Sequence, residues 1–307
     1  MIHFKLKNIN EIYKSETISD LNWYFLSDGD LWLTFGDTKL YEYSQEALEF
    51  LGQQKKSPYN DYFLIRFVLD FTALFSKISK SIPKKFYELA SDLPVFLSEN
   101  NKWLSLFESA ESNYQEAKYE DYLQLNSWVD ERTMDSGHLI GGPRFSFFRY
   151  DTKIKIVWQT DHILDNGIAL WTAKNGHFEM DYFEFVNKTK DFLNLFFIGM
   201  EKQVNAAIDL SIDNVKINKI ELKEHHIQFK KSAYEALIIL EANSKEKVNW
   251  EYTEQLYKKM KFEIEKSFIW KVLEDAAPAT FPPYANLEDK QFSAISHQEL
   301  FRLRKIE

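Results

Sequence analysis

Alternating apolar and polar residues dominate two stretches of the chain and predict antiparallel strands. The first begins with a short strand at residues 2–6 and continues over residues 21–44, where Asp-Gly and Gly-Asp pairs separate three aromatic-rich runs. Such pairs are typical of hairpin turns, so residues 21–44 are expected to form a three-stranded meander. The second stretch, residues 144–182, shows similar alternation and a Lys-Asn-Gly turn at residues 174–176.

A long apolar segment lies between these two stretches. Residues 60–80 are predicted to form one helix that Asn60 or Asp61 caps and that ends before the next proline. Apolar residues occur on nearly all of its faces, so most of the helix should be buried. Arg66 and Asp70 are four residues apart and are expected to pair on one face.

Helical spacing of apolar residues predicts most of the remaining elements. Ser44 is expected to cap a short helix over the residues that follow it. Further helices are predicted at residues 101–130 (one or two helices), 182–207, 221–243 and 251–272. Residues 277–290 contain prolines and are expected to form a linker before a short helix at 296–305.

Strand groups that alternate with long helices predict an α+β fold, with antiparallel β-meanders or hairpins and long helices packed on the sheet. We expect a single domain over residues 1–270 and a C-terminal tail over 271–307. Residues 21–80 and 145–207 also resemble each other, since both run from an aromatic strand through a glycine turn to a long helix. Either an old duplication or chance agreement between two hairpin–helix units explains this pattern.

The composition favours a folded protein with an aromatic core. Hydrophobic residues make up 45% of the 307 residues and aromatic residues 16%, and Tyr and Trp also favour partner surfaces. The net charge of −9 and the lack of basic runs interleaved with aromatic residues argue against nucleic-acid binding. An acidic surface fits a basic protein partner, or it serves only solubility.

The sequence contains no cysteine, which excludes disulfides, thiolate zinc sites and cysteine nucleophiles. The N-terminal residues lack the apolar core of a secretory signal, and the most apolar run, residues 62–75, is too short and too charged to cross a membrane. We therefore expect a cytoplasmic protein without a membrane partner.

Catalytic and metal-binding motifs are missing from the sequence. It has neither a Gly-x-Ser-x-Gly elbow nor a phosphate-binding glycine loop, so no catalytic residue is assigned. The adjacent His225 and His226 would point about 100° apart on a helix, and Glu221 with His225 lacks a second matching pair. No metal and no cofactor is therefore expected. Structural roles in turns, caps and pairs are assigned to Asp28, Gly29, Trp32, Asp61, Arg66, Asp70, Gly142 and Pro143.

The stretch at residues 131–150 contains the best candidates for a ligand site. Its reactive side chains would converge on an anionic ligand, and the histidine would titrate near neutral pH. These candidates are Arg132, Asp135, His138, Arg144 and Arg149. In the competing interpretation, which we favour, Asp135 caps a turn, the glycines supply unusual backbone angles and Pro143 starts a strand.

Four segments of the sequence contain recognisable motifs: LNWYFLSDGDLWLTFGDTKLYEY, YNDYFLIRFVLDF, RTMDSGHLIGGPRFSFFRYDTKIKIVW and GIALWTAKNGHFEM. Together and in this order they resemble a widespread bacterial family without assigned activity, domain of unknown function 5984. The motif positions are Tyr59, Asp61, Tyr62, Arg132, Asp135, Gly137, His138, Leu139, Gly142 and Pro143. Phe148 stands before Arg149 where the family pattern has Trp. The resemblance covers roughly residues 1–265 and implies a bacterial, intracellular protein, but no mechanism.

Two classes of function fit these observations. The acidity, the aromatic content and the missing catalytic motifs favour a non-enzymatic protein-binding factor of immunity or antitoxin type, with a toxin-like or neighbouring gene product as its partner. The alternative is a small-ligand-binding protein or an enzyme with an anion site at residues 131–150. Structural assembly through the C-terminal tail is a third hypothesis.

Overall fold

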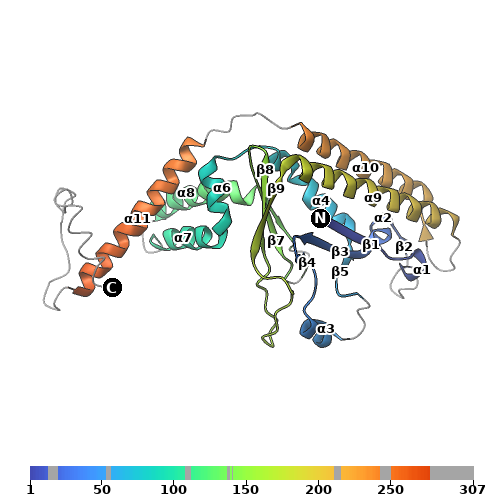
Figure 1. The fold of residues 1–307 in the computed structure, drawn as a ribbon, viewed down its shortest axis with the longest axis horizontal. Coiled ribbons are helices and arrows are strands. Elements are labelled where there is room, and N and C mark those ends of the chain that lie inside the picture. Colours follow the sequence, from blue (N-terminus) through green and yellow to red (C-terminus); the bar gives the residue numbers. More distant parts are fainter. Residues whose placement is uncertain are drawn as a thin grey trace. The chain divides into compact units, whose positions relative to one another are not determined.

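The computed structural model describes residues 1–12, 20–52, 57–107, 112–136, 139, 141–210, 216–242 and 250–276 (Figure 1). The chain divides into two compact units, residues 1–260 and 261–307. Of the second unit only residues 261–276 are described, and they continue helix α11 (Glu251–Ala276), which exposes Phe262 and Phe268. The linker and the short helix predicted for the tail lie outside the described residues.

Two antiparallel sheets organise the first unit, which confirms the α+β prediction. In the first sheet the central strand β3 pairs with the other three strands. Its strands are β1 (Ile2–Leu6), β3 (Asp28–Phe35), β4 (Thr38–Leu40) and β5 (Asn60–Phe63). The second sheet is a meander in sequence order, with strands β6 (Thr133–Asp135), β7 (Arg144–Tyr150), β8 (Lys153–Gln159) and β9 (Gly176–Asp181). A short parallel pair joins β2 (Asp20–Leu21) to β10 (Lys216–Ile217).

Most helices predicted from apolar spacing are present with ends that differ by several residues, but the helical segments at residues 9–12, 23–26 and 84–100 were not predicted. They are α1 (Ile9–Ile12), α2 (Trp23–Leu26), α3 (Gln45–Leu51), α4 (Leu64–Ala73), α5 (Phe75–Ile78), α6 (Lys84–Leu89), the 3₁₀ turn η1 (Ala90–Asp92), α7 (Leu93–Ser105), α8 (Ser112–Asp130), α9 (Tyr182–Asp209) and α10 (Lys219–Glu241). The predicted cap of α3 is confirmed, because the Ser44 hydroxyl accepts the N–H of Ala47 at 3.0 Å. Within the described parts of the chain, none of the helices is both long and apolar enough to cross a membrane.

The predicted meander at residues 21–44 is wrong in its first third. Residues 23–26 form helix α2, and the Asn22 side chain caps it by accepting two N–H groups at 3.0 and 3.3 Å. A helical turn allows Trp23 and Leu26, three residues apart, to be fully buried together. Asp28 and Gly29 lie inside strand β3 and not in a turn, and the hairpin turn is at Gly36, with φ +57°.

The predicted helix at residues 60–80 begins later than expected. Asn60 and Asp61 do not cap it, because they lie in strand β5 and pair with Leu31 and Asp30 of β3. The sheet hydrogen bonds of this strand satisfy backbone groups that a cap would otherwise have to satisfy. The helix then runs from Leu64 and breaks at Leu74 between α4 and α5. Arg66 is exposed and lies over the Tyr24 ring at 5.6 Å, and its pairing with Asp70 stays a prediction.

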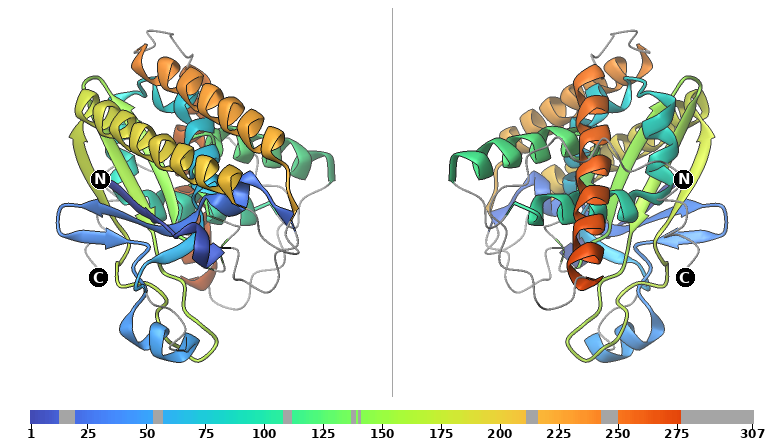
Figure 2. Two further views of the ribbon diagram at one scale, coloured as in Figure 1. Left: turned by 90° about the vertical axis from the view of Figure 1, so that its right-hand side faces the viewer. Right: turned by 90° about the vertical axis from the view of Figure 1, so that its left-hand side faces the viewer.

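Aromatic side chains connect the two sheets through one core. Phe147 of β7 packs on Phe71 of α4 at 5.4 Å and on Phe185 of α9 at 6.1 Å, measured between ring centroids. On the opposite face of β7, Phe148 packs on Trp128 of α8 at 5.1 Å. The second sheet is therefore covered by helices on both faces. Helices α9 and α10 lie side by side (Figure 2), joined by the Tyr182 hydroxyl, which donates to a carbonyl at the end of α10 at 2.7 Å.

The two segments that resemble each other in sequence differ in topology. Residues 145–207 form consecutive strands that lead into α9, whereas residues 21–80 place α3 between β4 and β5, and both strands pair with β3. Both segments end in a helix that directly follows a strand. The duplication stays a prediction.

We expect Gly29→Ala to destabilise the protein by about 2 kcal/mol or more, because overpacking against backbone is poorly relieved. A Cβ at position 29 would lie 2.4 Å from the Lys5 carbonyl oxygen. Urea unfolding followed by tryptophan fluorescence measures the loss. Gly199→Ala is the matched control, since its Cβ would meet side-chain ends and not backbone (Leu6 at 2.9 Å and Phe4 at 3.9 Å), and alanine favours helix. Equal losses for the two variants would contradict the explanation.

The buried His226 makes the stability depend on pH. Its side chain lies between Trp23 and Phe197, at 6.3 and 6.1 Å between ring centroids, and neither ring nitrogen has a hydrogen-bond partner. Burial lowers the pKa of His226 below its ordinary value of 6.5; Lys230 adds to this shift and Glu201 opposes it. Below pH 6.5 this histidine therefore binds a proton more readily in the unfolded chain than in the folded protein. The free energy of unfolding consequently falls as the solution becomes more acidic.

The variant His226→Leu should lose this part of the acid sensitivity. We expect the free energy of unfolding of the unaltered protein to fall more steeply than that of the variant between pH 7 and about pH 5. Urea titrations at several pH values measure both slopes. Parallel slopes for the His226 variant and the unaltered protein would refute the assignment.

Candidate functional site

The corner at residues 131–150 connects α8 to the second sheet and packs against distant loops. The Trp171 indole N–H donates to the Gly141 carbonyl at 2.7 Å, and the hydroxyls of Tyr41 and Ser136 lie 2.6 Å apart. A Cβ on Gly142 would lie 2.5 Å from the Ser136 carbonyl, so this glycine is needed for close approach. Strand β7 starts directly after Pro143, as the structural interpretation expected. Gly137, His138 and the side chain of Asp135 lie outside the described residues.

Arg132 is buried beneath this corner, with only 3% of its surface exposed. Its Nη1 donates to the Trp128 carbonyl at 3.2 Å, and its guanidinium lies 5.9 Å from the ring centroid of Trp250. Its Nε has no hydrogen-bond partner. Burial lowers the pKa of Arg132 to about 10, although the charge of Glu131 opposes the shift. The cation is therefore held mainly by aromatic surface and a backbone carbonyl.

Arg149 has different contacts from Arg132. Its Nε donates to the Asp151 carbonyl at 3.0 Å and its Nη1 to the Ser79 carbonyl at 2.5 Å, while the guanidinium lies over the Tyr182 ring at 4.0 Å. Arg144, at the start of the same strand, is exposed. The structure thus gives each predicted arginine a separate environment, and the two buried ones bind carbonyls of the protein itself.

We expect Arg149→Ala to destabilise the protein by about 2–4 kcal/mol, because two charge-assisted hydrogen bonds and a ring contact are lost. Arg144→Ala, five residues earlier in the same strand, should change stability by less than about 0.5 kcal/mol, since that side chain is exposed. Thermal and urea unfolding of both variants measure this difference. A loss of stability for Arg149→Ala no larger than that for Arg144→Ala would contradict this assignment.

The metal interpretation of the histidine pair gains no support. Nε2 of His225 lies 4.0 Å from a carboxylate oxygen of Glu221, and His226 faces the aromatic core. In the part of the chain that the structure describes, no three His, Asp or Glu side chains are grouped so that they could hold a metal ion.

Residues that the sequence marked as structural meet on the outer face of the first sheet. Along β3 buried and half-exposed positions alternate, so Asp28, Asp30 and Trp32 share the face that points away from the core. Pairing with β1 places His3 opposite Trp32, and their rings stack at 5.4 Å. Tyr59 stacks on the other side of Trp32 at 4.4 Å. We call His3, Trp32 and Tyr59 the aromatic ladder.

Carboxylates lie beside the aromatic ladder on the same face. Lys7 Nζ is 2.8 Å from Asp28 and 3.9 Å from Asp61. Asp61 is directly opposite Asp30 in the pairing of β3 with β5, an arrangement that is destabilising for like charges. Burial raises the pKa of Asp30 and the charge of Asp61 adds to the shift, while a hydrogen bond from Ser57 and the charges of Lys5 and Lys7 oppose it.

Sequence reasoning identified Asp28, Trp32 and Asp61 but missed this surface. The alternation along β3 could have placed Asp30 and Trp32 on one face. The position of Asp61 beside them depends on β5, which the sequence suggested was helical. Tyr59 lies directly before β5, so its position beside Trp32 depends on the same strand pairing. No local signal in the sequence therefore predicted the aromatic ladder.

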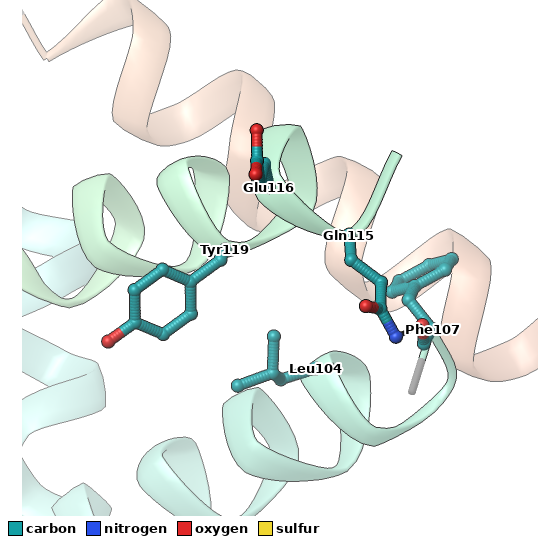
Figure 3. A pocket seen from close by; sticks show the side chains of 5 residues that line it. All are labelled: Leu104, Phe107, Gln115, Glu116 and Tyr119. Carbon is teal, nitrogen blue, oxygen red and sulfur yellow. Dashed lines mark hydrogen bonds between the residues drawn. The ribbon is translucent and has the colours of Figure 1, made fainter. Parts of the chain in front are cut away.

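A small apolar hollow of about 340 Å³ lies between α7 and α8. Figure 3 shows Leu104 and Tyr119 facing each other across it, with Phe107 at one end. The Gln115 amide closes that end by donating to the Phe107 carbonyl at 3.2 Å. The lining contains one ionisable carboxylate, Glu116, so the hollow offers apolar contact rather than acid–base chemistry.

These features define an α+β protein with two antiparallel sheets around an aromatic core and a stacked aromatic ladder on the outside. Residues 1–256 match the model of a family of unknown function, DUF5984, and the chain belongs to that family. The match confirms the resemblance inferred from the sequence motifs and includes both the corner and the aromatic ladder. No curated protein and no solved structure matches the chain significantly.

Proposed function

We propose that the protein is a non-enzymatic, protein-binding factor of immunity or antitoxin type, which binds a basic partner protein through the aromatic ladder. The observation that carries this proposal is the half-exposed stack of His3, Trp32 and Tyr59 on a sheet face. Tryptophan and tyrosine are the residues that most often dominate binding energy at interfaces. The stack also holds the rings in place before binding, which reduces the entropy lost on association.

The charges around the ladder support a basic partner. Asp30 and Asp61 repel each other in the free protein, and a lysine or arginine placed between them would relieve that repulsion. The net charge of −9 would accelerate the approach of a basic protein. The proposal places the protein in the bacterial cytoplasm, and the absence of cysteine fits a reducing compartment.

We do not adopt the alternative, an anion site at residues 131–150. Arg132 and Arg149 bind backbone carbonyls and aromatic rings of the protein, so neither presents its guanidinium to a shared ligand. Arg144 is exposed, and His138 lies outside the described residues.

Co-expression with the product of the neighbouring gene tests the proposal. We expect a complex that survives affinity capture, and we expect Trp32→Ala to weaken it by about 30-fold, the effect of losing an interface residue worth about 2 kcal/mol. Phe50→Ala, which removes a 58% exposed aromatic ring on α3, should leave affinity unchanged. No complex, or equal losses for both folded variants, would contradict the proposal.

Asp30→Asn separates a binding role from a structural one. The substitution keeps the shape of the side chain but removes the repulsion with Asp61, so it should raise the free energy of unfolding by up to about 1 kcal/mol. The same variant should bind the basic partner more weakly and with less dependence on salt concentration. Calorimetric titration at two salt concentrations and urea unfolding give the two readouts. A variant with less stability and unchanged affinity would make Asp30 purely structural.

A further inference from the structure

Two segments that are far apart in the sequence form a short antiparallel pairing, and beyond it their paths diverge. Tyr43 and Trp171 form an antiparallel bridge, and their rings stack at 4.6 Å. On either side of the bridge, the Ser44 N–H donates to the Leu170 carbonyl and the Thr172 N–H to the Glu42 carbonyl, both at 2.9 Å. These contacts fix the register of the two segments like the start of a β-ladder.

The same register does not continue beyond Thr172 and Glu42. If it did, Lys39 would face Asn175, and Thr38 would face Gly176. Instead a groove of about 800 Å³ lies between the segments, and all four of these residues line it. One side of the groove is strand β4 with the hairpin turn before it, and the other is the start of strand β9 with the loop that leads into it.

Both walls of the groove are edge strands. Within the described residues β4 pairs with β3 alone, and β9 pairs with β8 alone. Every second residue of an edge strand directs its N–H and C=O groups away from the sheet. The groove therefore lies where a strand between β4 and β9 would find main-chain partners.

The lining of the groove is apolar at its base and charged at its rim. Phe35 stacks on Trp158 at 5.6 Å and contacts Phe178 at 5.7 Å, and these three rings belong to both sheets. Asp37 is exposed on the rim beside β4, and Lys174 and His177 are exposed on the rim beside β9. An extended segment has alternating sides, so its apolar side chains would face the rings and its polar ones the rim.

The wall on the β9 side is preformed. The Trp158 indole N–H donates to the Lys174 carbonyl at 2.8 Å, and the Thr160 hydroxyl donates to the Ala173 carbonyl at 2.7 Å. The Asn175 side chain accepts the Thr160 N–H at 2.7 Å. Because these contacts hold the loop in place, little ordering is needed when a segment enters the groove.

The geometry points to an extended segment of a partner protein that inserts between β4 and β9 as an added strand. Such a segment alternates apolar and polar residues and carries an acidic side chain opposite Lys174 and His177. Strand addition of this kind draws affinity from main-chain hydrogen bonds and specificity from alternate side-chain positions. This inference concerns a different surface from the aromatic ladder and does not rest on the function proposed for that surface.

Selection of random linear peptides displayed on phage against the full-length protein tests the inference. We expect the enriched peptides to alternate apolar and polar residues and to contain an acidic residue. Hydrogen–deuterium exchange with the most enriched peptide, made synthetically, should slow the amides of residues 37–40 and 175–178 together. Enriched peptides without alternation, or protection that misses either segment, would overturn strand insertion, as would the absence of any enriched peptide.

Charge variants give an independent measurement with the same synthetic peptide. Lys174→Glu should weaken binding by about tenfold in fluorescence anisotropy, because it places a negative charge opposite the acidic residue. Lys202→Glu makes the same charge change at an exposed position of α9 and should leave binding unchanged. Trp32→Ala, which alters the aromatic ladder, should also leave it unchanged, so failure of either proposal can be recognised separately. Equal binding by the Lys174 variant and the unaltered protein would contradict the proposed orientation.

Discussion

Burial of both faces of the second sheet is the constraint on which the first unit depends. Every residue of β7 from Phe145 to Arg149 is buried, and so is every residue of β8 from Ile154 to Trp158. Charged side chains at such positions must find partners inside the protein. Arg149 therefore binds the Ser79 carbonyl at the end of α5, and Lys155 binds the Tyr87 carbonyl in α6 at 2.8 Å. Both polar contacts position helices as well as satisfying charges.

The first sheet differs, because it buries only one face against the core. Its other face is free to hold polar and aromatic groups whose arrangement the core does not require. The close approach of Asp30 and Asp61, and the continuous stack through Trp32, are found on that face. The core does not require like charges to lie opposite each other there, which supports the proposal that this face takes part in recognition.

The two proposed surfaces are adjacent. Lys39 lines the groove between β4 and β9, and its ammonium also lies 5.9 Å from the ring centroid of Tyr59, at the end of the aromatic ladder. One partner could therefore contact the ladder with a basic surface and place an extended segment in the groove. The two contacts would then act together, since the second would form at a high effective concentration.

The sequence by itself determined the elements whose signals are local. Apolar spacing predicted α8, α9, α10 and α11, the Ser44 hydroxyl marked the start of α3, and alternation predicted β1, β7 and β8, because these signals depend on residues within a few positions of each other. Only the tertiary structure decided that residues 60–63 form a strand, since the partner that satisfies their backbone groups is β3, about thirty residues away. It also decided the surroundings of the arginines: alternation along the sequence cannot reveal that both faces of β7 are buried, and this burial is why Arg149 donates to the Ser79 carbonyl.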